Sequence, residues 1–285
     1  MPQNELDIEL RNGVLQLSEK TMVMGVINVT PDSFSDGNLF YSKDKAIAHG
    51  LQMVEDGVDI IDIGGESTRP FSNPVPIEEE LDRVIPVVKA LTARCQVPIS
   101  IDTCKSEVAR QALDAGAALI NDISALLFDP AMGPLVASYG VPLVLMHMKG
   151  TPKTMQVSPD YDALIPEITK FLIEAMDRAM AYGIERRKII IDPGLGFGKQ
   201  VEHNLAILNK LSHFKILGRP ILLGASRKAF IGKVLGLDVN QREEGTSATV
   251  AIGVYNGANI VRVHNVLNAR RTVDMVEAIK RAGQL

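Results

Sequence analysis

Several features that would place a protein in a special class are scarce in this sequence. Two cysteines, Cys95 and Cys104, among 285 residues are too few for a disulfide framework and suggest a reducing, cytoplasmic location. No apolar run approaches the roughly 18 residues of a membrane span, and the first residues lack the basic region and apolar core of an export signal. With 30 basic and 34 acidic side chains, the net charge of −4 favours neither nucleic acid nor an anionic membrane as a partner.

The sequence has the composition of an ordinary globular protein. Hydrophobic residues make up 46% and charged residues 22%, which excludes a disordered chain. No stretch rich in proline, glycine or serine is long enough to act as a linker, and no short repeat occurs. We therefore expect one domain over residues 1–285.

Apolar runs of strand length recur along the chain, and most are followed by turn residues and then by helical periodicity. Because the runs are continuous rather than alternating, they suit a parallel sheet covered on both faces. Eight such units in about 250 residues favour a closed (β/α)₈ barrel over an open doubly wound sheet. The runs are Met22–Val29, Ile60–Gly64, Pro98–Asp102, Ala118–Asp122, Pro142–His147, Lys188–Asp192, Pro220–Gly224 and Asn259–His264.

The segment before the first run, residues 1–20, predicts a β-hairpin. Alternating apolar residues precede and follow Asn12-Gly13, a pair that favours a type I′ turn. We expect this hairpin to close the N-terminal end of the barrel.

Polar residues collect where the apolar runs stop. Taken singly, each is explained by capping or turn formation. Taken together they would meet at one mouth, where the chemistry of such barrels is built. They are Asn28, the segment from Gly64 to Arg69, Asp102, Asn121, Asp122, His147, Asp192, the segment from Ser226 to Lys228, Arg262 and His264.

Cations dominate the last two units. Arg262 and His264 are two residues apart on one strand, so their side chains point the same way, and Lys228 comes from the neighbouring unit. Phosphate sites in these barrels commonly lie after strands seven and eight, which predicts a phosphate or diphosphate ligand, with Arg69 as a further cation. The alternatives are surface salt bridges and, for His264, a packed neutral imidazole.

Acceptor groups come from other strands. Asp102, Asn121 and Asp192 would suit a ligand edge rich in N–H groups, such as a pterin or guanine, or else a metal. A metal is the weaker interpretation, because no cluster of histidines or cysteines accompanies them. The glycine-rich segment 194–199 is not a Walker loop, since three residues rather than four separate its first glycine from its Gly-Lys pair, and Gln200 follows that pair instead of serine or threonine.

The motifs resemble those of the dihydropteroate synthase family over nearly the whole chain. The two signatures of that family are matched by MGVINVTPDSFSDG at residues 24–37 and by GGESTRP at residues 64–70. They are followed in order by DPGLGFGK (192–199), SRK (226–228) and RVHNV (262–266). The resemblance implies that the amino group of p-aminobenzoate displaces pyrophosphate from 6-hydroxymethyl-7,8-dihydropterin diphosphate, giving 7,8-dihydropteroate for folate synthesis.

The resemblance also implies roles for particular residues, and a dissociative displacement in which Asp102, Lys228, Arg262 and His264 are catalytic. It implies Mg²⁺ bound at Asn28, and a homodimer formed through helices near the C-terminus. For the substrates, it implies a pterin site of Asp102, Asn121, Asp192 and Lys228 lined by Met146, Phe197 and Gly224, a diphosphate site of Arg69, Arg262 and His264, and a p-aminobenzoate site of Phe34, Thr68, Pro70 and Lys228.

Two positions depart from the family pattern. Phe71 stands where a glycine is usual, and Ala229 stands where many members have serine. If that glycine has positive φ, Phe71 changes the loop path, so we expect altered affinity for p-aminobenzoate and for sulfonamides. Two other functions remain open: a non-catalytic pterin-binding module, and a phosphate-binding aldolase or isomerase with Lys228 as its candidate lysine.

Overall fold

The structure is a computed structural model that describes residues 5–30, 39–67, 72, 74–155, 157 and 159–283, without the side chains of residues 39–42. An antiparallel pair comes first, β1 (Ile8–Leu10) and β2 (Gly13–Leu15). The parallel strands are β3 (Met22–Asn28), β4 (Ile60–Gly64), β5 (Ile99–Asp102), β6 (Leu119–Asp122), β7 (Leu143–Met146), β8 (Ile189–Asp192), β9 (Leu222–Leu223) and β10 (Ile260–Val263).

Helices alternate with these strands. They are α1 (Leu39–Glu55), α2 (Ile77–Thr92), α3 (Ser106–Asp114), α4 (Met132–Tyr139), α5 (Leu164–Ala181), α6 (Val201–Asn209), α7 (Ala229–Leu235), α8 (Glu243–Tyr255) and α9 (Val266–Ala282). Short 3₁₀ helices lie at Arg186–Lys188, Leu211–Leu217 and Val239–Gln241. In the part of the chain that is described, none of these helices has the length and apolar character to cross a membrane.

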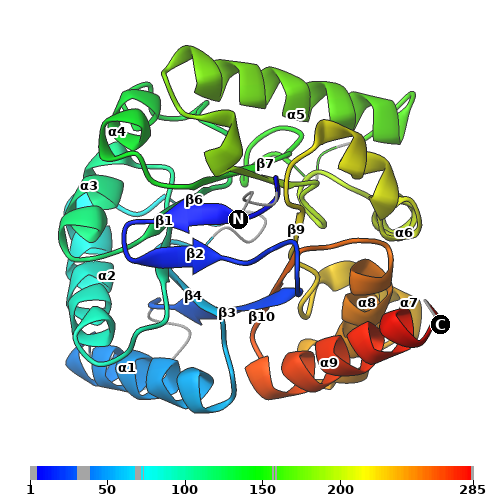
Figure 1. Ribbon diagram of the computed structural model, residues 1–285, viewed down its shortest axis with the longest axis horizontal. Coiled ribbons are helices and arrows are strands. Elements are labelled where there is room, and N and C mark those ends of the chain that lie inside the picture. The colour runs from blue at the N-terminus through cyan, green and yellow to red at the C-terminus, as the bar shows by residue number, and fades with distance from the viewer. Residues whose placement is uncertain are drawn as a thin grey trace.

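The parallel strands form a (β/α)₈ barrel, as predicted, and not an open doubly wound sheet. Their order is β8-β7-β6-β5-β4-β3-β10-β9, and a parallel bridge between Ile191 and Ile221 joins the two ends of that order. Each strand coincides with one of the eight predicted runs. Figure 1 shows the helices in a ring around the strands.

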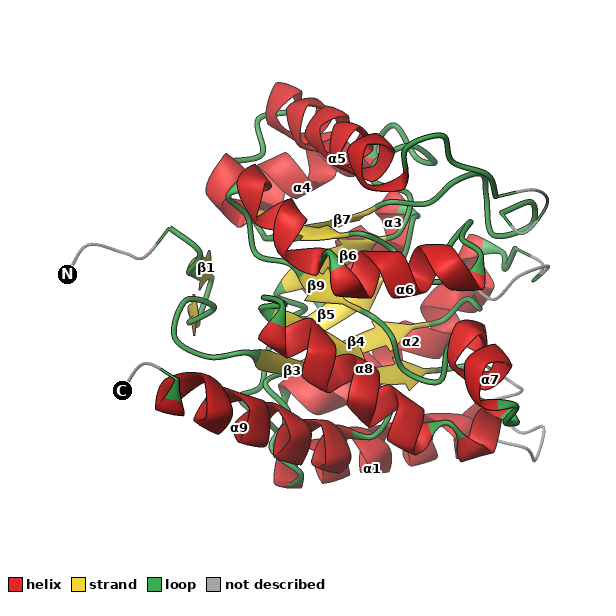
Figure 2. Ribbon diagram, turned by 90° about the vertical axis from the view of Figure 1, so that its right-hand side faces the viewer, coloured by secondary structure: helices red, strands yellow, loops and turns green. Residues whose placement is uncertain are grey.

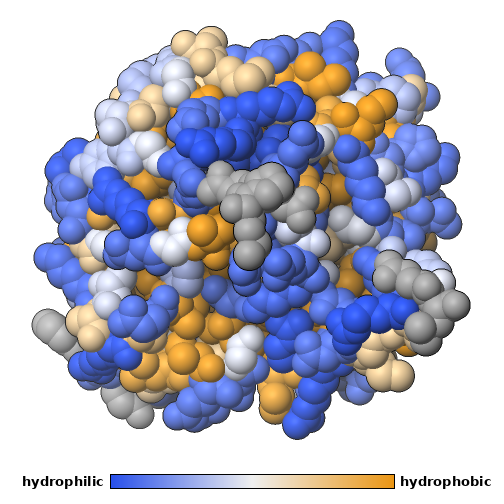
Figure 3. All heavy atoms as spheres, in the orientation of Figure 1, coloured by the Kyte–Doolittle hydropathy of each residue, from blue (hydrophilic) through white to orange (hydrophobic). Residues whose placement is uncertain are grey.

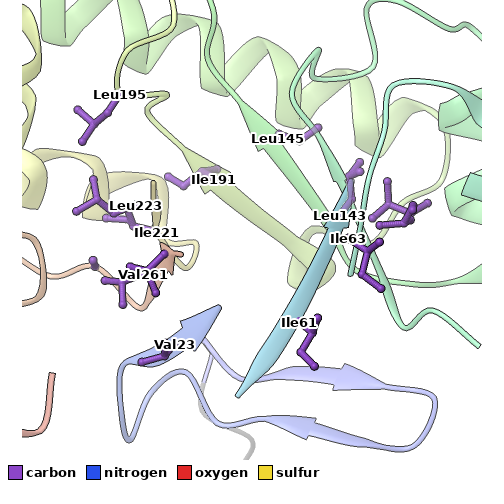
Figure 4. Packing of buried hydrophobic residues seen from close by; sticks show 14 of the residues in the cluster. Val23, Ile61, Ile63, Leu143, Leu145, Ile191, Leu195, Ile221, Leu223 and Val261 are labelled. Carbon is purple, nitrogen blue, oxygen red and sulfur yellow. The ribbon is translucent and has the colours of Figure 1, made fainter. Parts of the chain in front are cut away.

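The continuous apolar runs have a simple cause: both faces of each strand are buried. Outward-facing residues such as Ile61, Ile191 and Val261 pack against the helices in one cluster (Figure 4). Inward-facing residues such as Ile60, Ile190 and Ile260 form a second cluster inside the barrel. Burying one such side chain contributes about 1.5–3 kcal/mol, so each strand is stabilised from two sides.

The hairpin is confirmed, but its predicted turn is wrong. Leu10 pairs with Gly13, so the two loop residues are Arg11 and Asn12 and not Asn12-Gly13. A type I′ turn needs positive φ at both loop residues, and here only Gly13, the first residue of β2, has it, at 137°. Ile8, Leu15 and Leu17 pack onto the interior cluster and close that end of the barrel, beside which β1 lies in Figure 2.

The outer surface around the hairpin is mainly polar. Figure 3, in the same view as Figure 1, shows hydrophobic residues in separate patches between hydrophilic ones. The hairpin is therefore a cover for the barrel interior, and its outward residues Val14 and Arg11 are exposed. The opposite ends of the strands carry the polar residues described next.

Candidate active site

A pocket lies at the C-terminal ends of the strands, where the inward-facing positions change from apolar to polar. The alternation of strand residues places Arg262 and His264 on the same inner side, as the sequence predicted. The residues that line the pocket are Val26, Asp102, Asn121, Ile123, Met146, Asp192, Leu195, Phe197, Gly224, Ser226, Lys228, Arg262 and His264. Every predicted pterin-site residue is therefore among them.

Other predicted residues lie elsewhere. Asn28 ends β3 opposite Gly64 of β4 and is half-buried, but it does not line this pocket. Phe34 and the segment from Thr68 to Phe71, which includes Arg69 and Pro70, lie outside the described residues. The cation that Arg69 would supply is thus not placed by the described geometry.

Arg262 spans the barrel between two carboxylates. Its Nε donates to Oδ2 of Asp62 at 2.6 Å and its Nη2 donates to Oδ2 of Asp102 at 2.7 Å. Burial works against the charged guanidinium, but Asp62 and Asp102 outweigh it and raise the pKa of Arg262. The sequence predicted a group of separate cations here. The structure shows instead that Arg262 is ion-paired with Asp62 and Asp102.

Asp102 has an unusual protonation equilibrium. Burial raises the pKa of its carboxyl to about 7, against the opposing effect of Arg262, and the nearby carboxylate of Asp62 adds to the rise. Such a group changes charge near neutral pH, which is typical of functional sites. Asp192 is also buried, and burial raises its pKa, although its Oδ1 accepts a hydrogen bond from the Gly194 N–H at 2.7 Å.

Lys228 lies over the pocket wall. Its Nζ is 4.0 Å from the ring centroid of Phe197, within the range of a cation–π contact. Burial lowers the pKa of Lys228 to about 8, while the charge of Asp192 opposes this change. The amine remains mostly protonated at neutral pH, beside an aromatic face that can stack on a planar ring.

The turn that carries Lys228 is held in a costly conformation. Arg227 has a φ of 56°, which is uncommon for a residue with a side chain. Its N–H donates to Oγ1 of Thr246 at 3.0 Å, and its carbonyl accepts from Nη1 of Arg242 at 3.1 Å. Strain that is held by surrounding contacts is frequent at active sites.

The glycines of segment 194–199 allow close packing of the backbone, which agrees with the prediction that this segment is not a Walker loop. Gly194 and Gly198 have φ of 70° and 62°, and a Cβ on Gly194 would lie 1.9 Å from the carbonyl oxygen of His147. Only glycine fits both the conformation and the close approach. The resulting turn places Phe197 in the pocket wall. The Nζ of Lys199, which is also buried, lies 2.9 Å from Nδ1 of His147.

Sequence reasoning missed two residues of the site. Asp62 has no exposed surface and contacts Arg262 and Asn121, yet it was part of an apolar run and received no role. Asp62 is two residues from both Ile60 and Gly64, so strand alternation places it on the same inner face, and this was the signal that the sequence offered. Ser226 was noted only as a strand-end residue, but its Oγ lies 2.9 Å from Nδ1 of His264.

The pocket offers acceptors on one side and cations on the other. The carboxylates of Asp102 and Asp192 suit the N–H edge of a heterocycle, while Lys228 and His264 suit an anion. Among the described residues no three histidine, cysteine, aspartate or glutamate side chains form a metal cage. The amide oxygen of Asn28 is a hard oxygen ligand of the kind that magnesium accepts.

Comparisons with known proteins agree with this chemistry. Residues 24–264 match the model of a family described as pterin binding enzyme. The dihydropteroate synthase of Bacillus subtilis strain 168 is 46% identical over 287 residues, covering 99% of this chain and 98% of that protein.

Solved structures with the same fold are also those of dihydropteroate synthases. The Yersinia pestis dihydropteroate synthase in complex with a sulfonamide drug has a TM-score of 0.92 at 43% identity, covering 97% of this chain and 100% of that chain. The Xanthomonas albilineans dihydropteroate synthase in complex with 7,8-dihydropteroate has a TM-score of 0.87 at 41% identity, covering 96% and 98%.

Proposed function

This chain belongs to the dihydropteroate synthase family of transferases, and we propose that its pocket binds and activates the dihydropterin substrate in the manner set out here. The reaction joins p-aminobenzoate to 6-hydroxymethyl-7,8-dihydropterin diphosphate, releases pyrophosphate and gives 7,8-dihydropteroate for folate synthesis. The observation that carries the proposal is that acceptors from β5, β6 and β8 meet Arg262 and Lys228 in one pocket.

The pterin ring is bound by the acceptor side. Asp102, Asn121 and Asp192 lie at the ends of three different strands and accept from the amino-pyrimidinone edge. Phe197 and Met146 are 9% and 3% exposed and provide the apolar walls of the slot. Gly224 leaves room for the ring because it has no side chain.

The diphosphate is bound by the cation side. Lys228, Arg262 and His264 stabilise the negative charge that grows on pyrophosphate as the C–O bond breaks. The methylene group left behind is a cation conjugated with the ring, and the charges of Asp102 and Asp192 favour it. The displacement is therefore dissociative, and no residue acts as a covalent nucleophile.

Magnesium completes the leaving-group site in this proposal. Asn28 would hold the ion through its amide oxygen, and the ion would supply positive charge that stabilises the leaving pyrophosphate. Asn28 lies beside Gly64, which in turn pairs with Asp102, so its amide is positioned next to the same mouth.

The second substrate enters above the pterin. We propose that Phe34, Thr68, Pro70 and Lys228 bind p-aminobenzoate and that Arg69 assists at the diphosphate. Ala229 is the exposed first residue of α7 and supplies no hydroxyl for the substrate carboxylate, so the N-terminal N–H groups of the α7 turn are the alternative donors. Altered affinity for p-aminobenzoate and sulfonamides is expected from this change and from Phe71.

We further propose a cytoplasmic homodimer. Exposed apolar side chains gather on neighbouring helices near the C-terminus, with Ile252 and Tyr255 of α8 at 51% and 62% exposure and Met275 and Ile279 of α9 at 62% and 52%. A contact between copies through α8 and α9 would cover them. Cys95 and Cys104 are both free thiols, which suits a reducing compartment.

Pyrophosphate release tests the proposal. The purified protein is given Mg²⁺ and dihydropterin diphosphate, with and without p-aminobenzoate, and dihydropteroate is measured in parallel. Release that requires p-aminobenzoate and equals dihydropteroate formed is expected. Binding of the pterin without release in either case would instead support a non-catalytic pterin-binding module.

A further inference from the structure

Asp62 is a fully buried carboxylate beneath the pocket. It lies on β4, between Ile60 of the apolar interior cluster and Gly64 at the strand end, and its exposed fraction is 0%. It does not itself line the pocket. A buried carboxylate without partners is strongly disfavoured, so its hydrogen bonds explain why it is retained.

Both hydrogen bonds of Asp62 go to residues that line the pocket. Its Oδ2 accepts from Nε of Arg262 at 2.6 Å and from Nδ2 of Asn121 at 3.0 Å. Its Oδ1 is buried and has no partner among the described residues. The interactions of this carboxylate therefore converge on one cation and one amide, which come from opposite sides of the barrel.

The contact to Asn121 fixes the direction of its amide. A carboxylate oxygen only accepts, so the nitrogen of Asn121 must face Asp62 and the amide oxygen must face away from it. Asn121 lines the pocket, so its oxygen is presented there as an acceptor for an N–H group. No other described residue hydrogen-bonds the side chain of Asn121, so among these residues only Asp62 distinguishes the two orientations of the amide.

The contact to Arg262 occupies one nitrogen of the guanidinium, and a second nitrogen is occupied by Asp102. Nε is used by Asp62 and Nη2 by Asp102, while no described residue accepts from Nη1. The planar fork is thus held at two points, and its third nitrogen is left for an oxygen of the diphosphate. A guanidinium fixed before binding loses little entropy when it meets the leaving group.

We propose that Asp62 is a positioning residue that orients Arg262 toward the diphosphate and Asn121 toward the pterin before substrate binds. This inference rests on the proposed function for its kinetic consequence, but the geometry can be tested without turnover. Asp62 touches no substrate, so its effect must pass through Arg262 and Asn121. That requirement separates it from a residue that merely stabilises the fold.

Kinetics of Asp62→Asn provide the first test. We expect kcat/KM for dihydropterin diphosphate to fall by about 10- to 100-fold, which is the usual cost of losing a hydrogen bond to a charged group. The KM for p-aminobenzoate should stay within about twofold of wild type, because the side chain of Asp62 hydrogen-bonds only Arg262 and Asn121 among the described residues that line the pocket. The matched control is Asp59→Asn, just before the same strand, where Asp59 binds Lys20, Arg270 and the Val23 N–H away from the pocket. This control should lose stability and keep its activity. Equal KM changes for both substrates, or unchanged kinetics, would overturn the proposal.

A double-mutant cycle tests whether Asp62 acts through the arginine. Adding Asp62→Asn to Arg262→Lys should cost less than Asp62→Asn costs in the wild type, because the part of its effect that passes through Arg262 is already lost. A loss equal to the product of the two separate losses would contradict positioning.

The ¹⁵N spectrum of the wild-type protein tests the geometry independently of catalysis or of the folding of any Asp62 variant. The Nε–H of Arg262, identified by its absence from Arg262→Lys, should be protected from solvent exchange without substrate. Exchange as fast as that of an exposed arginine would overturn the inference. An inactive wild type with a protected Nε–H would refute the proposed function alone and leave the positioning geometry supported.

Discussion

The two ends of the barrel interior differ in chemistry although the same strands build both. At the hairpin end, the inward positions are Ile60, Ile190, Leu222 and Ile260, all fully buried and apolar. Two residues further along the same strands, the inward positions are Asp62, Asp192, Gly224 and Arg262. One step of the strand repeat, two residues, therefore separates an apolar layer that stabilises the fold from a polar layer at the pocket, where we propose that substrate binds.

This difference shows how the barrel keeps charged groups in its interior. The apolar layer and the hairpin exclude water from one end, while the polar layer is open to the pocket. The buried charges are not isolated, because Arg262 pairs with Asp62 and Asp102. Changes in the polar layer should therefore alter activity more than stability, and changes in the apolar layer should do the reverse.

The largest effect on activity is expected from Lys228→Met. Removing the cation should lower the rate of pyrophosphate release by about 10²- to 10³-fold, the usual cost of losing one group that stabilises transition-state charge. Because burial lowers the pKa of Lys228, the folded state disfavours the protonated amine, and methionine should leave stability unchanged or raised. Lys233→Met, on the exposed side of α7, is the control. Full activity in Lys228→Met would contradict the assignment of activity to the polar layer.

The converse change is Ile190→Ala in the apolar layer. Ile190 is fully buried, so the cavity should cost about 2–5 kcal/mol in the free energy of unfolding, measured with urea. At a temperature where the variant is folded, the rate of pyrophosphate release should stay within twofold of wild type. Val14→Ala on the exposed outer side of the hairpin should change neither. Lost activity without lost stability would show that the two layers are not separable.

The barrel could be predicted from the sequence because its signals are repetitive. Eight continuous apolar runs, each ending in polar residues, specify strands buried on both faces and the end where they meet. The turn of the hairpin could not be placed to the residue. Asn12-Gly13 favours a type I′ turn locally, but the pairing of Ile8 with Leu15 sets the register and moves the turn by one residue.

The site could be predicted as a set of residues but not as a network. Arg262 was expected to be a cation at one side, whereas its length lets it reach Asp102 on β5 across the barrel. Asp62 received no role because its inward position in the strand alternation shows where it points but not what it contacts. Its importance depends on Arg262, 200 positions away in the sequence, and only the closed barrel brings them together.

A pH titration tests the role of Asp102 in the polar layer. In the proposed function its ionised carboxylate accepts from the pterin N–H groups, and burial raises its pKa to about 7. Affinity for dihydropterin, measured by fluorescence, should therefore rise about tenfold per pH unit below 7 and level off above it. Asp102→Asn should bind weakly with no such slope, and Asp114→Asn on the exposed side of α3 should keep it. A slope that persists in Asp102→Asn would assign the titration to another group.

The smallest predicted effect comes from Ser226, whose hydroxyl contacts His264 and is given no direct contact with substrate in the proposed function. The Oγ of Ser226 accepts from the backbone N–H of His264 at 3.2 Å and lies 2.9 Å from Nδ1 of the same residue. These two contacts hold the imidazole of His264 in place at the pocket.

Ser226→Ala should therefore lower kcat/KM for dihydropterin diphosphate by about fivefold to tenfold, the worth of one ordinary hydrogen bond. Ser100→Ala is the matched control, because Ser100 is fully buried in the barrel and its Oγ has no partner among the described residues. It should leave kcat/KM unchanged. Equal losses in the two variants would mean that small changes anywhere in the interior disturb the pocket, and that the boundary between the two layers is less sharp than the strand alternation implies.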